Sequence, residues 1–425
     1  MKNQISKEKL QPVRGTKDLY GKEIQSFNHI IETAKKSVEL YGFNEISTPI
    51  FEFSEIFERN LGETSDIISK EVYKFPDRGD NFLTLRPEFT AGVIRALISN
   101  GELAQTLPQK LFSSGPVFRY DRPQKGRQRQ FHQINFESIG QDHFLSDSEM
   151  IVLAARILKD LKILKKTQLH VNTLGSEKTK ENYQAALIEY FSKYEKDLSN
   201  DSQKRLQKNP LRILDSKDAG DIEISMNAPS IQDFLSVDEG EAFRKALTLL
   251  SELGIEYYIN PKLVRGLDYY TGIVFEFVTN DLGTQNTVLA GGRYDNLVAQ
   301  MGGQNLPAIG FAAGIERLML LSEFENEAKR PIFVVYVTEK EEIEATKLAF
   351  RLREKGMYAE ITFGGNMKKQ MKKATLANSK FVVIIGEDEV KNKELTVKNF
   401  DTGSEEKVAN KNILKYLKSG LEEGE

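Results

Sequence analysis

The sequence predicts an α+β fold in two domains, a large amino-terminal one over residues 1–325 and a smaller α/β one over residues 331–425. Strand-like and helix-like apolar patterns are mixed along the first domain without a regular order. A charged, helix-prone stretch from about residue 174 to 240 interrupts them and predicts an inserted helical subdomain. After a charged linker, strands and helices alternate regularly.

The first predicted helix lies after residue 18. Apolar residues recur at helical spacing from Phe27 to Tyr41, and Gly42 ends the pattern. Residues 43–53 look extended. Pro49 within them suits a strand edge or a bend, because proline cannot donate a hydrogen bond to a central ladder.

The next elements lead to a hairpin. Strand patterns occur at residues 72–75, 82–85, 111–118 and 131–139. A helix is predicted near residues 90–100, between the second and third of these strands. The last two strands flank a polar loop that contains Pro123 and Gly126, which is typical of a β-hairpin.

Further elements complete both domains. A helix at residues 147–165 and a strand at residues 168–173 precede the insertion. Strands at 256–259, 273–279 and 286–290 and a helix at 315–321 follow it. The second domain has predicted strands at 332–337, 359–363, 381–385 and 395–400, and helices at 341–355, 367–377 and from 411. We expect this domain to fold as a compact α/β unit.

Composition excludes several classes of function. The 62 acidic residues nearly balance the 59 basic ones, so any contact with RNA must be local. Cysteine is absent, which excludes disulfides and thiolate chemistry, and none of the four histidines is paired at metal spacing, so no metal site is predicted. No apolar stretch reaches the roughly 20 residues that cross a bilayer, so we expect a soluble cytoplasmic protein.

The hairpin carries the most chemical information. Between Arg119 and Arg129 it holds four arginines and one lysine against one aspartate. Planar guanidinium groups suit phosphate, although a solvated basic loop explains this spacing equally well. Beyond the loop, alternation places four side chains on one sheet face: Phe131, Gln133, Asn135 and Glu137. Such a row beside a basic cluster can hold a small zwitterion near a polyphosphate.

This hairpin resembles motif 2 of class II aminoacyl-tRNA synthetases, and residues 122–133 (RPQKGRQRQFHQ) look like the histidine enzyme. Residues 263–272 (LVRGLDYYTG) and 290–295 (AGGRYD) resemble two signature peptides of histidyl-tRNA synthetases. Residues 310–317 (GFAAGIER) are similar to motif 3, and the region around Pro49 is similar to motif 1, through which two subunits pair. The resemblance covers essentially the whole chain.

The resemblance implies both a fold and a function. The first domain would be a class II synthetase catalytic core, an antiparallel sheet flanked by helices, and the second an α/β anticodon-binding domain. The implied enzyme is a homodimeric aminoacyl-tRNA ligase that activates L-histidine with ATP and transfers it to the 3′ end of tRNA-His. Mg²⁺ is expected to arrive with the nucleotide, held largely by phosphate oxygens and water.

The resemblance also implies roles around ATP. Arg119 and Arg265 are the expected catalytic residues, which hold the α-phosphate from two sides, and Arg317 is expected to reach the γ-phosphate. A fixed guanidinium stabilises charge that develops in the transition state more strongly than water does. The implied ATP-binding residues are Arg119, Arg127, Phe131, Gly314 and Arg317.

For histidine, the resemblance places Glu88, Thr90 and Gln133 around the α-ammonium group. Two partners are needed for the two imidazole nitrogens, and the family uses Glu137 and Tyr270. The full implied histidine-binding set is Glu88, Phe89, Thr90, Arg119, Gln133, Glu137, Arg265, Tyr269, Tyr270 and Tyr294. Phe89 departs from the family pattern, which usually has glycine there, and this puts the local backbone path in question.

In the second domain, four lysines fall on adjacent tracks of one predicted helix, with Lys380 nearby. They are Lys368, Lys369, Lys372 and Lys373. They can meet tRNA phosphates, or they can form an ordinary solvated face.

Three alternative functions compete. A synthetase-like regulatory subunit of ATP phosphoribosyltransferase typically lacks the second domain and the catalytic residues, which this chain keeps. A class II synthetase for threonine, proline or glycine would lack the two histidine-type peptides. A pure RNA-binding protein would leave the arginines and tyrosines without a purpose.

Overall fold

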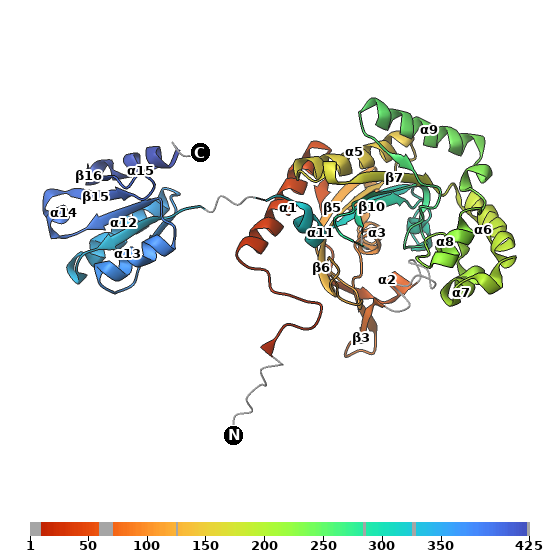
Figure 1. The fold of residues 1–425 in the computed structure, drawn as a ribbon, viewed down its shortest axis with the longest axis horizontal. Coiled ribbons are helices and arrows are strands. Elements are labelled where there is room, and N and C mark those ends of the chain that lie inside the picture. The colour runs from red at the N-terminus through yellow and green to blue at the C-terminus, as the bar shows by residue number, and fades with distance from the viewer. Residues whose placement is uncertain (1–9, 59–70, 125, 284–285, 325–328, 423–425) are drawn as a thin grey trace, which may run out of the picture. The chain divides into compact units, whose positions relative to one another are not determined.

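The computed structural model describes residues 10–58, 71–124, 126–283, 286–324 and 329–422. The chain divides into two compact units, residues 1–325 and 326–425 (Figure 1). Lys125 of the basic loop, and part of the charged linker, lie outside the described residues. Within the described residues, no helix is both long enough and apolar enough to cross a membrane.

An eight-stranded sheet forms the centre of the first unit. Its strands are β1 (Asn44–Glu45), β5 (Gln109–Phe118), β6 (Gln130–Ile139), β7 (Gln168–Thr173), β8 (Tyr258–Ile259), β9 (Thr271–Val278), β10 (Thr287–Arg293) and β11 (Ala308–Gly314). Their order is β1-β5-β6-β11-β10-β9-β7-β8. All neighbours are antiparallel except the outermost pairs, β1 with β5 and β7 with β8, which are parallel.

Helices cover one face of this sheet and build the main core. They are α1 (Lys22–Leu40), α5 (Phe144–Asp160), α9 (Val237–Glu252) and α11 (Ile315–Leu321). Alternation along the strands sends Ile134 and Phe136 into this core, where the Phe136 ring stacks on Phe311 at 4.3 Å between centroids. Gly42 has φ of 73°, a left-handed conformation that allows the chain to turn after α1 as predicted.

The opposite face carries shorter elements. They are α2 (Glu55–Glu58), α3 (Thr90–Ser99), α4 (Gly101–Gln105) and α10 (Leu297–Gln300). A second core there joins α3 to Tyr269 and Tyr294. A small antiparallel sheet lies beside them, with β2 (Phe51–Phe53), β4 (Phe82–Leu85) and β3 (Tyr73–Pro76) in that order. Both β1 and β2 are edge strands, as the proline between them predicts.

The expected helical insertion contains α6 (Glu177–Ser192), α7 (Asn200–Lys208) and α8 (Ala219–Ser225), which are grouped together in Figure 1. Side chains of Ser176, Ser199 and Asp218 accept hydrogen bonds from the first-turn amides of these helices, which fixes where each begins. α9 starts within the stretch predicted as insertion, but its apolar side packs against α5 in the main core.

The second unit is a five-stranded mixed sheet with helices on both faces. Its elements are β12 (Ile332–Tyr336), α12 (Glu342–Glu354), β13 (Ala359–Ile361), α13 (Met367–Leu376), β14 (Phe381–Ile385), α14 (Glu387–Asn392), β15 (Glu394–Asn399), β16 (Glu405–Ala409) and α15 (Ile413–Glu422). The strand order is β13-β12-β14-β15-β16, parallel as far as β14 and antiparallel beyond it. α12 and α15 pack on one face and α13 on the other.

The main difference from the predicted elements is β11, because no strand was predicted between residue 290 and the helix at residues 315–321. It is a central strand between β6 and β10. Its small residues do not give a strand-like pattern. They are needed because the neighbouring strands approach closely: a Cβ on Gly291 of β10 would lie 2.2 Å from the Gly310 carbonyl oxygen. The strand β16 and the helix α14 were also not predicted, and β8 is shorter than expected.

Candidate active site

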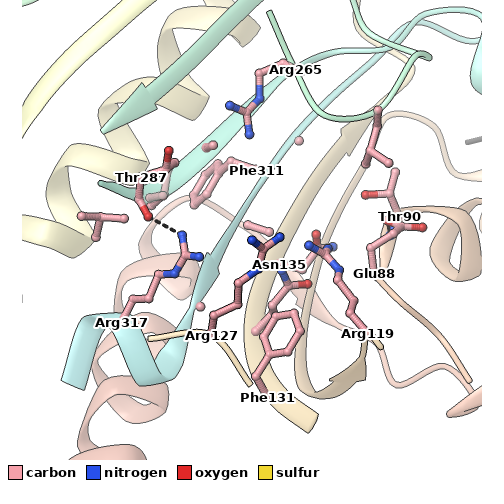
Figure 2. Close-up of a pocket in the computed structure, with 18 of the residues that line it drawn as sticks. Glu88, Thr90, Arg119, Arg127, Phe131, Asn135, Arg265, Thr287, Phe311 and Arg317 are labelled. Carbon is pink, nitrogen blue, oxygen red and sulfur yellow. Dashed lines mark hydrogen bonds between the residues drawn. The ribbon is translucent and has the colours of Figure 1, made fainter. Parts of the chain in front are cut away.

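One pocket opens on the sheet face opposite the main core, and strands β6, β10 and β11 contribute to its wall (Figure 2). Almost all residues that the sequence singled out meet there, although they come from five separate stretches of chain. Those that line the pocket are Glu88, Thr90, Arg119, Arg127, Phe131, Gln133, Arg265, Tyr269, Tyr270, Tyr294, Gly314 and Arg317. The predicted polar face of β6 is therefore the face that borders the pocket, since Asn135 lines it as well.

Four guanidinium groups converge on this pocket. Figure 2 shows Arg119, Arg127, Arg265 and Arg317 directed toward the same space. Arg119 follows β5, Arg127 lies on the hairpin loop, Arg265 precedes β9, and Arg317 is in the first turn of α11. A cluster of fixed guanidinium donors is suited to a polyphosphate.

Hydrogen bonds to main-chain oxygens hold two of these arginines. Arg119 Nε donates to the Pro87 carbonyl at 2.9 Å, and the Arg119 guanidinium lies 5.3 Å from the Phe131 ring centroid. Arg317 donates to the carbonyls of Gly126 at 3.1 Å and Thr287 at 2.6 Å. Because carbonyls accept hydrogen bonds without neutralising charge, both guanidinium groups keep their attraction for anions.

Carboxylates hold the other two. Arg265 Nη1 lies 3.0 Å from Oε2 of Glu276 on β9, and Arg127 pairs with Asp121 at the base of the hairpin loop. Burial, followed by the like charges of Arg119 and Arg127, lowers the pKa of Arg317 to about 10. Arg119 and Arg127 therefore repel Arg317, and a bound anion would relieve that repulsion.

Glu88 lies on the other side of the pocket, where it begins a helix. Its carboxylate accepts the main-chain amides of Thr90 and Ala91, the latter at 2.9 Å, in the first turn of α3. Burial raises the pKa of Glu88, while these amides and the Arg119 guanidinium act in the opposite direction.

Glu137 lies beneath the pocket wall and is 1% exposed. It accepts hydrogen bonds from Thr90 Oγ1 at 2.6 Å, from Asn135 Nδ2 at 3.0 Å and from the Tyr294 hydroxyl. Burial raises its pKa to about 8. A Cβ on Gly310 of β11 would lie only 1.8 Å from Glu137 Oε2, so the glycine leaves the space that this carboxylate occupies.

Two buried polar atoms that border the pocket lack a protein partner among the described residues. They are Gln133 Oε1 and Arg265 Nε. Buried polar atoms are nearly always hydrogen-bonded in folded proteins. An unmatched acceptor on one side and an unmatched donor on another indicate that a ligand with both kinds of group completes the pocket.

Tyrosines close the end of the pocket near Glu137. The rings of Tyr269 and Tyr294 meet edge to face at 5.6 Å between centroids, and Tyr270 lies 4.8 Å from Tyr269. Besides its ring contacts, Tyr294 contributes its hydroxyl, which donates a hydrogen bond to Glu137.

Phe89 does not line the pocket. Its ring is 1% exposed and lies 4.1 Å from the Arg86 guanidinium, which itself donates to main-chain oxygens of Thr48 and Pro116. The backbone at Phe89 is right-handed, with φ of −97°, so no glycine is needed at this position. The side chain thus packs behind the pocket wall.

Several residues in the pocket or next to it were not predicted from the sequence. Glu276, Asp121 and Glu316 hold arginines or strands in place, and Glu316 accepts the His132 main-chain amide at 3.0 Å. A carboxylate inside the apolar run of β9 was the available signal for Glu276. In the described part of the chain, no group of three or more His, Asp or Glu side chains is arranged to hold a metal ion.

Two family models and several known proteins match both units of this chain. The family model described as histidyl-tRNA synthetase matches residues 15–318, and the anticodon-binding-domain model matches residues 331–420. A histidine–tRNA ligase of Wolbachia pipientis subsp. Culex pipiens (strain wPip) is 51% identical over 399 residues, which cover 94% of this chain and 97% of that protein.

Solved structures extend the comparison. The apo S. aureus histidyl-tRNA synthetase is 32% identical, with a TM-score of 0.81 over 96% of this chain and 99% of that one. A Bacillus halodurans protein described as an ATP phosphoribosyltransferase regulatory subunit/histidyl-tRNA synthetase is 23% identical, with a TM-score of 0.62 over 88% of this chain and 98% of that one, which shows a common fold alone.

The matches confirm the class II fold and favour a synthetase over the regulatory alternative. The sequence resemblance was carried by short peptides, whereas these matches extend through both units. The chain belongs to the histidyl-tRNA synthetase family.

Proposed function

We propose that this chain joins L-histidine to ATP, forming histidyl-adenylate and pyrophosphate, and then transfers histidine to the 3′ end of tRNA-His. Family membership supports a histidine–tRNA ligase that uses ATP. The observation that carries the proposal is the convergence of four guanidinium groups beside two buried carboxylates. Cations on one side suit the triphosphate, and carboxylates on the other suit an ammonium group and an imidazole.

The arginines are assigned to MgATP, which enters as one substrate. Arg119 and Arg265 hold the α-phosphate while a histidine carboxylate oxygen attacks its phosphorus and pyrophosphate leaves. Arg127 and Arg317 hold the outer phosphates. Gly314 lets the nucleotide approach the backbone before α11, and Phe131 offers it a ring face. Catalysis then consists of positioning and charge stabilisation, with no covalent intermediate on the protein.

The carboxylate side is assigned to histidine. Glu88, the Thr90 hydroxyl and Gln133 Oε1 surround the α-ammonium, which would give the unmatched Gln133 oxygen a donor. Glu137 and the Tyr270 hydroxyl meet the two imidazole nitrogens, and Tyr269 and Tyr294 pack around the ring. A site with a hydrogen-bonding partner for each ring nitrogen rejects amino acids that lack them. Phe89 supports this side from behind, through Arg86.

We assign residues 1–325 to catalysis, with residues 174–240 as a helical insertion, and residues 331–425 to anticodon binding. A cytoplasmic homodimer is the expected form. Support for the dimer comes from the small sheet β2-β4-β3. One face of this sheet presents Phe51, Phe53 and Phe75, each at least 39% exposed. Contiguous exposed aromatic side chains of this kind are typical of an interface.

In the second unit, we assign anticodon contact to the loop before α13 and to that helix. Phe363 is 90% exposed, yet its loop is fixed: the Gly364 amide donates to the Tyr336 hydroxyl at 3.0 Å, and Gln370 Nε2 donates to the Gly365 carbonyl at 2.9 Å. The four predicted lysines of α13 are all exposed, whereas Lys380 donates to the Leu421 carbonyl of α15. An exposed aromatic ring on a fixed loop that leads into a lysine-rich helix suits base stacking next to phosphates.

ATP–pyrophosphate exchange with each of the 20 amino acids tests the proposed function. Histidine alone should stimulate exchange, because the pocket offers partners to both imidazole nitrogens. Exchange that stays at background with every amino acid would overturn the proposal, and so would stimulation by a different amino acid.

Arg265→Ala should lower the kcat of exchange by about 100- to 1000-fold, because it removes a guanidinium that acts on the charge of the transition state. Histidine affinity, measured by equilibrium binding, should fall only severalfold. Arg244→Ala is the matched control, since Arg244 is an exposed arginine on α9. Equal losses in kcat and in affinity would contradict the assigned role.

Glu137→Gln should separate stability from recognition. Because burial raises the pKa of Glu137 from 4.5 to about 8, the folded protein favours the neutral carboxyl where the unfolded chain is already ionised. Ionisation of Glu137 therefore destabilises the folded protein. The loss of stability is absent below about pH 4.5, grows as the pH rises, and reaches its full value above about pH 8. The melting temperature of the variant minus that of the parent should therefore be larger at pH 8 than at pH 5. The kcat/KM of the variant for histidine should fall by about 10- to 100-fold.

Circular dichroism melts at the two pH values measure this difference. Glu181→Gln, on the exposed side of α6, provides the control and should shift the melting temperature equally at both pH values. A pH-independent difference for Glu137→Gln would show that burial does not perturb this carboxyl.

Phe363→Ala should raise the KM for tRNA-His in aminoacylation by about 5- to 150-fold, since stacking on one base contributes about 1–3 kcal/mol. Phe363→Trp should retain binding, and Phe350→Ala, which removes another exposed phenylalanine from α12, serves as control. Pyrophosphate exchange, which does not involve tRNA, reports whether the first unit is intact. An unchanged KM for Phe363→Ala would remove this residue from the RNA surface.

A further inference from the structure

The loop that carries Arg265 and Tyr270 is a thin wall between two cavities. It connects β8 to β9 and contains no helix or strand from residue 261 to 270. The ligand pocket lies on one side, and Arg265, Leu267 and Tyr270 also line a second cavity between this loop and the helical insertion. The position of the two substrate-binding side chains therefore depends on what lies behind the loop.

Three polar side chains of the insertion contact the back of this wall. Lys180 on α6 is 8% exposed, and its Nζ donates to the carbonyls of Asp268 at 2.7 Å and Tyr270 at 3.2 Å. Arg212 Nη2 donates to the Gly266 carbonyl at 2.7 Å, and Asn209 Nδ2 donates to Asp268 Oδ1 at 2.7 Å. Without regular structure, these carbonyls need partners from elsewhere in the fold.

Apolar contacts and one ion pair complete the arrangement. Leu263 and Val264, at the start of the loop, belong to the same buried cluster as Leu187 and Leu211 of the insertion. From the opposite side, Glu276 of the sheet pairs with the Arg265 guanidinium at 3.0 Å. The insertion thus fixes the backbone of the loop, while the sheet fixes the head of its arginine.

We propose that the helical insertion positions the substrate loop, and that Lys180, Asn209 and Arg212 are positioning residues that act through Arg265 and Tyr270. This inference rests on the proposed function of those two residues. Lys180 has the central place, because one buried ammonium group joins two carbonyls next to the tyrosines of the pocket. Small displacements of a group that positions substrate are costly for rate, on the order of 100-fold for about 1 Å.

Lys180→Met tests the proposal, since methionine keeps an unbranched apolar side chain and removes the three donors. The kcat/KM for histidine in pyrophosphate exchange should fall by about 10- to 100-fold. Lys180→Arg, which keeps charge and donors, should restore most of it. Lys178→Met, on the exposed side of the same turn of α6, removes the same charge and should match the parent.

A merely structural lysine would lower the melting temperature and leave kcat/KM unchanged in the folded range, and this result would overturn the proposal. Arg212→Met provides a second variant should Lys180→Met fail to fold, because Arg212 is less buried. If Lys180 acts through Arg265, the effects of Lys180→Met and Arg265→Ala will not add, whereas full additivity would contradict the coupling. Absence of histidine-dependent exchange in the parent would instead refute the proposed function itself.

Discussion

Gathering four guanidinium groups in one partly buried pocket is the constraint on which the first unit depends. Like charges repel strongly where water is scarce, so each arginine needs a fixed acceptor. The acceptors come from separate segments: the carbonyls of Pro87, Gly126 and Thr287, and the carboxylates of Asp121 and Glu276. The pocket therefore exists only when the hairpin, the sheet and the substrate loop are assembled. A central sheet suits this task because the strands that contribute to the pocket wall, β6, β10 and β11, each have a neighbouring strand on both sides.

The same sheet has to leave room for polar groups beneath its surface. Gly310 of β11 pairs across the sheet with Glu137 of β6, and because it has no side chain it leaves the space that the Glu137 carboxylate occupies. Small residues weaken a strand in isolation, since they bury little apolar surface. The large rings on the opposite face compensate, with Phe136, Phe311 and Phe275 packed together in the main core. One face of the sheet thus carries the main apolar core, and the other carries the pocket.

Sequence patterns were sufficient where function follows local periodicity. Alternation along β6 predicted which side chains border the pocket, and short peptides identified the arginines and tyrosines because these lie within contiguous motifs. Residues that act across long sequence separations gave no such signal. Lys180, for example, meets the carbonyl of Tyr270, 90 residues along the chain, only after folding. Likewise, β11 was not predicted, because its glycines and alanines have low strand propensity. These small residues are there because the neighbouring strands approach closely. Phe89 differed from the expected glycine, yet its backbone required none.

The pocket also contains polar and charged groups that are unfavourable in the absence of substrate. Gln133 Oε1 and Arg265 Nε are buried without protein partners, Arg317 is held among like charges, and Glu137 is ionised only at a cost. Each of these features lowers the stability of the folded protein before substrate arrives. Each also offers an interaction that needs no rearrangement when a nucleotide and an amino acid enter, since the supporting hydrogen bonds are already formed. Binding energy is then available for the transition state and is not consumed in ordering the site. The apolar cores on both faces of the sheet stabilise the fold enough to offset the unfavourable groups in the pocket.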